Sequence, residues 1–130
     1  RRPRMLCVQS EVTPPLVRAF YSGADDSTVV EAGSTMSFGL NVPGGVGHFK
    51  VLDIIRRSGG AAIAVSEADT GAELQRVWRD KRWWISPEGA ACLAAIPQLL
   101  DRGLLKKGER VVAVNTGSSE KYLPAVRHLM

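Results

Sequence analysis

The stretch Gly60-Ala-Ala-Ile-Ala-Val-Ser66 decides the fold class of this chain. Every residue between the glycine and the serine is apolar, so neither face of an extended segment would be polar. A strand with this composition is typical of a sheet that is covered on both faces. A second short apolar run, Met5 to Gln9, precedes it, and amphipathic stretches lie on either side. This alternation predicts an α/β fold of three layers, with helices on both faces of a mostly parallel sheet.

Helical periodicity surrounds the decisive strand. Before it, Phe49, Leu52 and Ile55 mark one side of a helix that runs into Arg56-Arg-Ser-Gly-Gly60, and basic residues followed by glycine are typical of a helix end. Pro87 stands where a first-turn proline would, and Pro97 is expected to kink the helix that follows. The other predicted helices are Leu16–Tyr21, Glu67–Lys81 and Glu88–Asp101.

Three more segments have the composition of short strands. The first two are Thr28–Ala32 and Trp83–Ile85. The third, Val111–Val114, is apolar throughout, so we expect a further strand covered on both faces. Between the first strand and the helix that precedes Gly60, the four glycines of Ser34–Gly47 indicate an ordered loop.

Composition bounds the class of protein. With 130 residues, 45% of them hydrophobic, and a mean hydropathy of -0.04, residues 1–130 are expected to form a single α/β segment without a separate linker or second domain. The net charge of +4 includes a basic tip of Arg1, Arg2 and Arg4, which is weaker evidence for a nucleic-acid partner than a basic face would be. No apolar run approaches the roughly 18–20 residues that span a bilayer. We therefore expect neither a nucleic-acid nor a membrane partner.

The reactive side chains are few. Cys7 and Cys92 have apolar neighbours, which predicts buried thiols in a reducing compartment, the cytoplasm. His48 and His128 are far apart and no CxxC is present, so no metal site is expected. None of the five lysines has the apolar setting of a Schiff-base lysine, and no catalytic triad can be assembled.

Polar side chains follow four of the predicted strands. In an α/β sheet, ligands bind at the carboxyl ends of the strands, so these clusters predict a site at that edge. The clusters are Gln9-Ser10-Glu11, Ser66-Glu67, Ser86-Pro87-Glu88-Gly89 and Asn115-Thr116-Gly117-Ser118.

Each cluster also has a structural interpretation. Asn115–Ser119 can cradle a phosphate or a ring nitrogen, or it can simply turn the chain. Ser86 and Glu88 are what an ordinary helix start prefers. Gly44–Gly47 fits neither phosphate-loop pattern and indicates a conformational loop.

The remaining polar and aromatic groups also allow two interpretations. His48 and Lys50 can contact an anion, although solvated side chains at a helix start are the simpler expectation. The tryptophans Trp78, Trp83 and Trp84 are expected to pack between helix and strand and not to stack on bases.

Several motifs follow one another along nearly the whole chain. They are Met5-Leu-Cys-Val-Gln-Ser-Glu11 with Pro15-Leu-Val-Arg-Ala-Phe20, Gly39-Leu-Asn-Val-Pro43 with Val51–Gly60, Ala62-Ile-Ala-Val-Ser-Glu67, Pro87-Glu-Gly-Ala-Ala91, and Asn115-Thr-Gly-Ser118 with Lys121-Tyr122. In this order they resemble the C-terminal portion of threonine synthases. These are fold-type II pyridoxal-phosphate enzymes of the tryptophan-synthase-beta superfamily.

The resemblance implies a cofactor site. Thr116 would hydrogen-bond the pyridine nitrogen of pyridoxal 5'-phosphate, with Gly117 and Ser118 beside it, and Glu88 and Ala90 would line the same edge. Gln9 and Ser10 would lie at the edge of the substrate pocket. In the family, the Schiff-base lysine and the phosphate-binding loop precede the portion matched here. The resemblance therefore implies no catalytic residue and no covalently held cofactor in this segment.

The implied reaction converts O-phosphohomoserine and water to threonine and phosphate. The partners would be the preceding portion of the enzyme and a small amino-acid substrate, with a homo-oligomer left open, and the segment alone would be inert. Phe38 and Ser119 depart from the family pattern, which has Ser-Gly-Leu and a glycine there. Two alternatives stay open: another fold-type II lyase, similar to threonine dehydratase or cysteate synthase, or a stand-alone binding or regulatory module. The first residue, an arginine, suggests a chain cut from a longer one.

Overall fold

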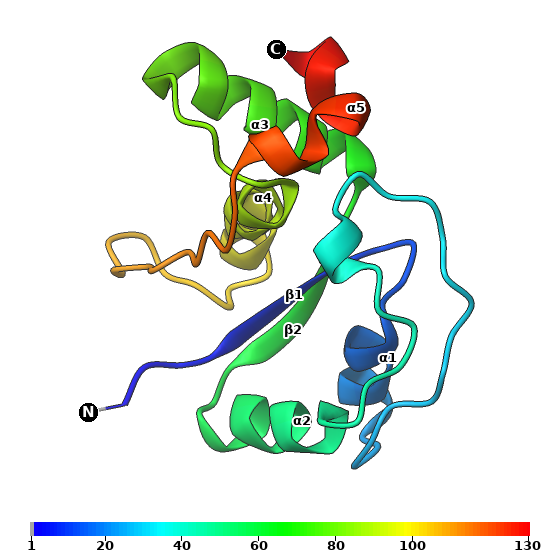
Figure 1. Ribbon diagram of the computed structural model, residues 1–130. Helices are drawn as coiled ribbons and strands as arrows, with labels where there is room; N and C mark the ends of the chain where they lie inside the picture. Colours follow the sequence, from blue (N-terminus) through cyan, green and yellow to red (C-terminus); the bar gives the residue numbers. More distant parts are fainter. Residues whose placement is uncertain (1) are drawn as a thin grey trace.

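Two parallel strands form the centre of the fold (Figure 1). The computed structural model describes residues 2–130, and Arg1 of the basic tip lies outside them. Strand β1 (Leu6–Ser10) pairs with β2 (Ala61–Val65) from Leu6 opposite Ala61 to Ser10 opposite Val65. The predicted strand at Ala61–Val65 is confirmed, and β1 is displaced by one residue from the predicted run.

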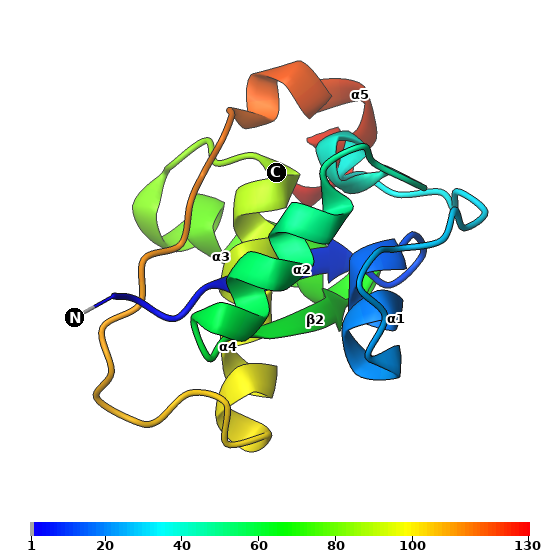
Figure 2. The same ribbon diagram turned by 90° about the horizontal axis from the view of Figure 1, so that it is seen from below.

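Helices cover both faces of this narrow sheet, which confirms the three-layer α/β class (Figures 1 and 2). Helices α1 (Pro15–Ser22) and α2 (His48–Arg57) pack on one face, where Leu16, Ala19 and Leu52 form a buried apolar cluster. Helix α4 (Pro87–Asp101) packs on the other face, and α3 (Glu67–Lys81) lies against α4. On the α4 side the buried residues are Ile63, Val65, Ala91, Ala94, Ala95, Leu99 and Leu105.

The helix boundaries follow from local chemistry. The Ser66 hydroxyl accepts a hydrogen bond from the Asp69 N–H at 3.0 Å and caps α3, as Ser86 caps α4 through the Gly89 N–H at 3.2 Å. After α2 the chain passes close to β1. Glycine is needed at position 60 because a Cβ there would overlap the Met5 carbonyl oxygen. Pro97 lies inside α4, which continues beyond it to Asp101.

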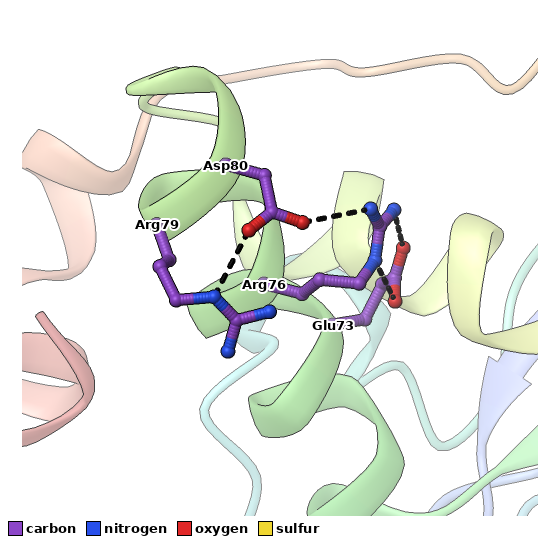
Figure 3. A network of polar contacts seen from close by, with 4 residues as sticks. All are labelled: Glu73, Arg76, Arg79 and Asp80. Carbon is purple, nitrogen blue, oxygen red and sulfur yellow. Dashed lines mark hydrogen bonds and ion pairs between the residues drawn. The ribbon is translucent and has the colours of Figure 1, made fainter.

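The outer face of α3 is a surface of ion pairs (Figure 3). Arg76 contacts Glu73 through two nitrogens and lies 3.6 Å from Asp80, and Arg79 lies 2.9 Å from the same aspartate. Hydrogen bonding to Glu73 raises the pKa of Arg76, and hydrogen bonding to Arg79 lowers the pKa of Asp80. These pairs all lie within α3 and are largely exposed, so they add little stability.

Three strand predictions are wrong. Thr28–Ala32 is an exposed loop whose backbone contact is the Val30 N–H to the Pro43 carbonyl. In Trp83–Ile85, Ile85 forms a single antiparallel bridge with Ser118. Val111–Val114 is irregular and its Val112 is 81% exposed. Strand composition produces a strand only beside a neighbouring strand, and within residues 2–130 these segments have no such neighbour beyond the single bridge from Ile85 to Ser118.

The expectations for aromatic, histidine and cysteine side chains are partly corrected. Trp78 and Trp84 pack edge to face at 4.7 Å, whereas Trp83 is 65% exposed and does not pack as predicted. His48 is not solvated as expected: it is buried, because its Nδ1 pairs with the Ser27 hydroxyl at 2.6 Å. Both cysteines are free thiols, half-buried instead of fully buried.

The C-terminal segment forms a third packing cluster. A 3-10 turn (Ser119–Tyr122), the short helix α5 (Leu123–Val126) and a second turn (Arg127–Leu129) lie over α3 and the start of α4 (Figure 1). Val126 is fully buried against Leu74 and Ala90. None of the helices described over residues 2–130 has both the length and the apolarity needed to cross a membrane.

Candidate functional site

The carboxyl ends of both strands meet at a half-buried carboxylate, Glu67. Its Oε1 accepts hydrogen bonds from the hydroxyls of Ser10, at 3.2 Å, and Thr35, at 2.5 Å. Its Oε2 accepts from the Met36 N–H at 2.8 Å. The first residue of α3 therefore ties the end of β1 to the loop that follows Ser34.

A second group of contacts closes that loop. The Thr13 hydroxyl donates to Asn41 Oδ1 at 2.7 Å and accepts from the Gly33 N–H at 3.0 Å, and the Asn41 amide donates to the Gly33 carbonyl at 3.0 Å. Thr13 is fully buried. These contacts join Gly33 to Asn41 and so hold the first part of the predicted ordered loop, Ser34–Gly47. We call residues 33–41 the clasped loop.

Glu88, at the start of α4, holds the other side of the clasped loop. Its Oε1 accepts from the Gly39 N–H at 2.8 Å. The residue is 8% exposed, and its Oε2 is buried without a hydrogen-bond partner among residues 2–130. The N-terminal turn of a helix favours a carboxylate, which accounts for its location but not for the unpaired oxygen.

The turn after residue 114 packs directly on the start of α4. Asn115 Oδ1 accepts from the Ser86 N–H at 3.0 Å and lies 3.2 Å from the Ser86 hydroxyl, and its amide donates to the Gly117 carbonyl at 2.7 Å. Gly89 allows this approach, because a Cβ there would overlap the Asn115 amide oxygen. The third and fourth polar clusters are therefore joined by Asn115.

The residues expected to bind the cofactor surround this junction. Thr116 is exposed, and no hydrogen bond of its side chain is found among residues 2–130. Gly117 lies against Ser86, and the Ser118 hydroxyl caps the following turn by accepting from the Glu120 N–H at 3.4 Å. Ala90 is fully buried one residue after Gly89.

The two residues expected at the substrate edge have structural partners. Gln9 Oε1 accepts from the Leu16 and Val17 N–H groups, at 2.9 and 3.1 Å, and so satisfies the start of α1. Ser10 donates to Glu67. Their role at a pocket edge stays a prediction.

Sequence reasoning missed the organisation of the clasped loop. Glu67 was recognised only as part of a polar strand end, while Thr35, Asn41 and the Gly39 N–H were not singled out. The signal for Glu67 was its place directly after a buried strand. The loop residues have no comparable local signal, because their partners are 20 to 49 positions away in the chain.

Three groups near the sheet and Glu88 have raised pKa values. Burial raises the pKa of Cys7 to about 11, with Cys92 adding to the effect. Burial and then the charge of Glu88 raise the pKa of Cys92. Burial, then hydrogen bonding to the Glu88 side chain, and then the charge of Glu88 raise the pKa of Tyr122. Neither thiol is therefore an activated nucleophile. Within residues 2–130, no group of three or more His, Cys, Asp or Glu side chains could hold a metal ion.

Comparison with known proteins identifies the family. The family profile described as "Pyridoxal-phosphate dependent enzyme" matches residues 1–117. The chain belongs to this family. Its relatives include the threonine synthase of Methanosarcina acetivorans, 32% identical over 115 residues, and that of Methanocaldococcus jannaschii, 29% identical over 119 residues. The matches cover 88% and 92% of this chain but 28% and 29% of those enzymes, so the chain spans under a third of their length.

Solved structures of two other enzymes share the fold. The T.th. threonine deaminase superposes with a TM-score of 0.62 at 21% identity, over 84% of this chain and 41% of that chain. The serine racemase of Dictyostelium discoideum gives a TM-score of 0.59 at 20% identity, over 82% of this chain and 35% of that chain. The chain is therefore a fold-type II member, similar in sequence to threonine synthase.

Two polar groups in this part of the fold have the chemistry to contact the ring of pyridoxal phosphate, the Thr116 hydroxyl and Glu88 Oε2. A ring nitrogen needs a neutral or acidic hydrogen-bonding partner, and the Thr116 hydroxyl has no partner of its own within residues 2–130. Glu88 Oε2 is a buried acceptor for which no geometric hydrogen bond is found within residues 2–130. The donor set thus suits the ring of the cofactor, whereas none of the contacts described over residues 2–130 forms a phosphate cradle.

Proposed function

We propose that this chain forms the cofactor-ring wall of a pyridoxal-phosphate enzyme that converts O-phosphohomoserine and water to threonine and phosphate. The observation that carries the proposal is the 32% identity to a threonine synthase over 115 residues. The complete polypeptide would have the length of those relatives and supply the remaining walls.

The residues of the chain have distinct parts in this proposal. When bound, pyridoxal phosphate supplies an electron sink for charge that develops beside the substrate amino group. Thr116 would hold the ring nitrogen through a neutral hydroxyl, with Gly117 and Ser118 shaping the turn. Ala90 would pack behind the ring edge, in the cluster with Leu74 and Val126, and Glu88 would present a buried acceptor. A neutral partner leaves the ring nitrogen less protonated than a carboxylate would, which moderates the electron sink.

The clasped loop would form a side of the substrate pocket. Glu67 and Glu88 hold it from two directions, so its position relative to the start of α4 is fixed before any ligand arrives. A pre-positioned wall lowers the entropy lost on binding and keeps the reacting groups aligned. Both free thiols are compatible with the cytoplasm, where we place the reaction.

A deaminase is the second candidate, because a threonine deaminase shares its fold with 84% of this chain. The two reactions differ in what they release. Phosphate and threonine would come from O-phosphohomoserine, whereas a deaminase would release ammonia from a hydroxy amino acid.

The test uses the complete polypeptide, purified with pyridoxal phosphate and given each substrate separately. We expect one phosphate per threonine from O-phosphohomoserine and no ammonia from threonine. Ammonia release from threonine without phosphate release would overturn the proposed reaction in favour of the deaminase. Omitting the cofactor after dialysis against a carbonyl reagent is the matched control.

A further inference from the structure

An open pocket lies where the second half of α3 meets the end of the chain, which packs over that helix (Figure 1). Its volume is about 300 Å³, and the residues that line it are Gln75, Trp78, Arg79, Arg82, Leu129 and Met130. The first four are three or four positions apart, so they form one stripe along α3. Leu129, half-buried in the cluster around Leu74, and Met130 form the apolar wall opposite.

Arg82 has a strained backbone. Its φ is 56°, and among residues 2–130 no other residue except glycine has a positive φ. The Arg82 N–H donates to the Trp78 carbonyl at 3.0 Å and so ends α3. Glycine is the usual residue at such a helix end, because a side chain is disfavoured in the left-handed conformation. Strain of this kind is concentrated at functional sites, which directs attention to what the arginine side chain does.

The two guanidinium groups of the pocket are held in place and have donors to spare. The Arg82 guanidinium lies over the Trp78 ring at 5.5 Å, and Trp84 packs edge to face on that ring at 4.7 Å. Arg79 donates through Nε to Asp80 at 2.9 Å. Within residues 2–130, no hydrogen bond or ion pair is found for the two terminal nitrogens of Arg79 or for the Arg82 side chain (Figure 3 for Arg79).

We propose that this pocket binds a small carboxylate that has an apolar body. The planar guanidinium groups of Arg79 and Arg82 match the geometry of a carboxylate, and the remaining wall is formed by Trp78, Leu129 and Met130. Small-molecule sites begin at roughly this volume and combine apolar walls with a few polar groups. The carbonyl end of a helix repels an anion, so binding here depends on the two arginines.

The ligand class follows from both halves of the pocket. A neutral molecule of the same shape would leave the guanidinium donors without an acceptor, and a bare anion would leave the apolar wall in contact with water. None of the lining residues belongs to the proposed cofactor site at Thr116 and Glu88. The inference therefore does not rest on the proposed function.

The first measurement is a titration of the 130-residue chain with benzoate, followed by NMR of the Trp78 indole N–H. That signal is identified by its absence in Trp78→Phe. We expect a Kd of about 1 mM for benzoate, and binding at least about fivefold weaker for benzamide, its neutral counterpart. Acetate and inorganic phosphate, tested by competition with benzoate, should also bind at least about fivefold more weakly. Benzamide binding as tightly as benzoate, or phosphate displacing benzoate at equal concentration, overturns the assignment.

The second measurement separates binding from folding. Arg82→Gly removes the guanidinium and suits the left-handed backbone, so we expect benzoate to bind at least about fivefold more weakly while the urea midpoint does not fall. Arg79→Ala should weaken binding to a similar extent. Arg18→Ala is the matched control, because it removes the same charge from an exposed position of α1 outside the pocket. Unchanged benzoate affinity in both pocket variants, or an equal loss in Arg18→Ala, overturns the proposal. A lower urea midpoint in Arg82→Gly overturns the argument from strain. Neither measurement uses cofactor or substrate, so failure here is distinct from failure of the proposed reaction.

Discussion

Replacing Glu67 by alanine should release the clasped loop and destabilise the whole chain. Glu67 accepts hydrogen bonds from Ser10, Thr35 and Met36, and no other contact among residues 2–130 joins β1, the loop and α3 at one point. Its removal leaves the Met36 N–H and the buried Thr35 hydroxyl without their acceptor. Such losses are among the few mechanisms by which a single substitution has a large effect.

The magnitude can be worked from the contacts. A hydrogen bond to a charged group contributes about 1.5–3 kcal/mol, and three bonds to one carboxylate are not additive. A carboxylate in the first turn of a helix adds about 0.3–1 kcal/mol. We therefore expect Glu67→Ala to lower the free energy of unfolding by about 4 kcal/mol. Glu67→Gln should lower it by about 2 kcal/mol, because one oxygen still accepts while the amide nitrogen cannot.

Urea unfolding followed by circular dichroism measures both values. With a slope of about 2 kcal/mol per molar urea, the midpoint should fall by about 2 M for alanine and about 1 M for glutamine. Asp53→Ala is the matched control, because Asp53 forms an exposed pair with Arg57 at 3.3 Å and should change the stability by less than about 0.5 kcal/mol. If Glu67→Ala is no more destabilising than Asp53→Ala, the carboxylate does not hold the loop, and the reasoning is refuted.

Three further predictions concern a thiol, an exposed segment and a glycine. Because the pKa of Cys7 is about 11, its alkylation rate should rise about tenfold per pH unit from about pH 8 to about pH 10, and a rate plateau below about pH 10 would contradict this. The free energy of unfolding should fall as the pH rises from 9.0 toward 11, because the unfolded thiol ionises first. Val112→Lys should change the free energy of unfolding by less than about 0.5 kcal/mol, since Val112 is 81% exposed, and a loss above about 2 kcal/mol would mean that the segment is covered after all. Gly89→Ala should lower the free energy of unfolding in urea by about 1–3 kcal/mol, because the added Cβ would overlap Asn115. Gly47→Ala is the control and should leave it unchanged, because the space around Gly47 is open; equal effects would refute the close approach.

The sequence was most informative where a segment's own chemistry decides its structure. Ala61–Val65 is apolar on both faces and lies between two layers of helices, as its composition required. The predicted helix Glu67–Lys81 has the observed bounds, because Ser66 caps its start and the alternation of charged and apolar residues defines its two faces. Ser86 likewise both caps α4 and anchors the turn at Asn115.

Predictions from the sequence were wrong or missing where the structure of a segment depends on residues far away in the chain. Val111–Val114 has the composition of a buried strand, but a strand is stabilised by its pairing partner, and none lies beside it within residues 2–130. The same dependence hid the clasped loop, since Thr35 and Gly39 carry no local sign that carboxylates at positions 67 and 88 will bind them. The burial of His48 also has no local signal, because its hydrogen-bonding partner, Ser27, is 21 positions away in the sequence.

The most direct test of the central claim is cofactor affinity in the complete polypeptide with Thr116 replaced by valine or by serine. We propose that the Thr116 hydroxyl forms a hydrogen bond to the ring nitrogen, worth about 1 kcal/mol. Equilibrium dialysis should show pyridoxal phosphate held about fivefold less tightly by Thr116→Val, and nearly as tightly as wild type by Thr116→Ser, which keeps the hydroxyl. Equal affinity in the valine variant and the wild type would contradict the account, because the exposed hydroxyl would then have no part in holding the ring.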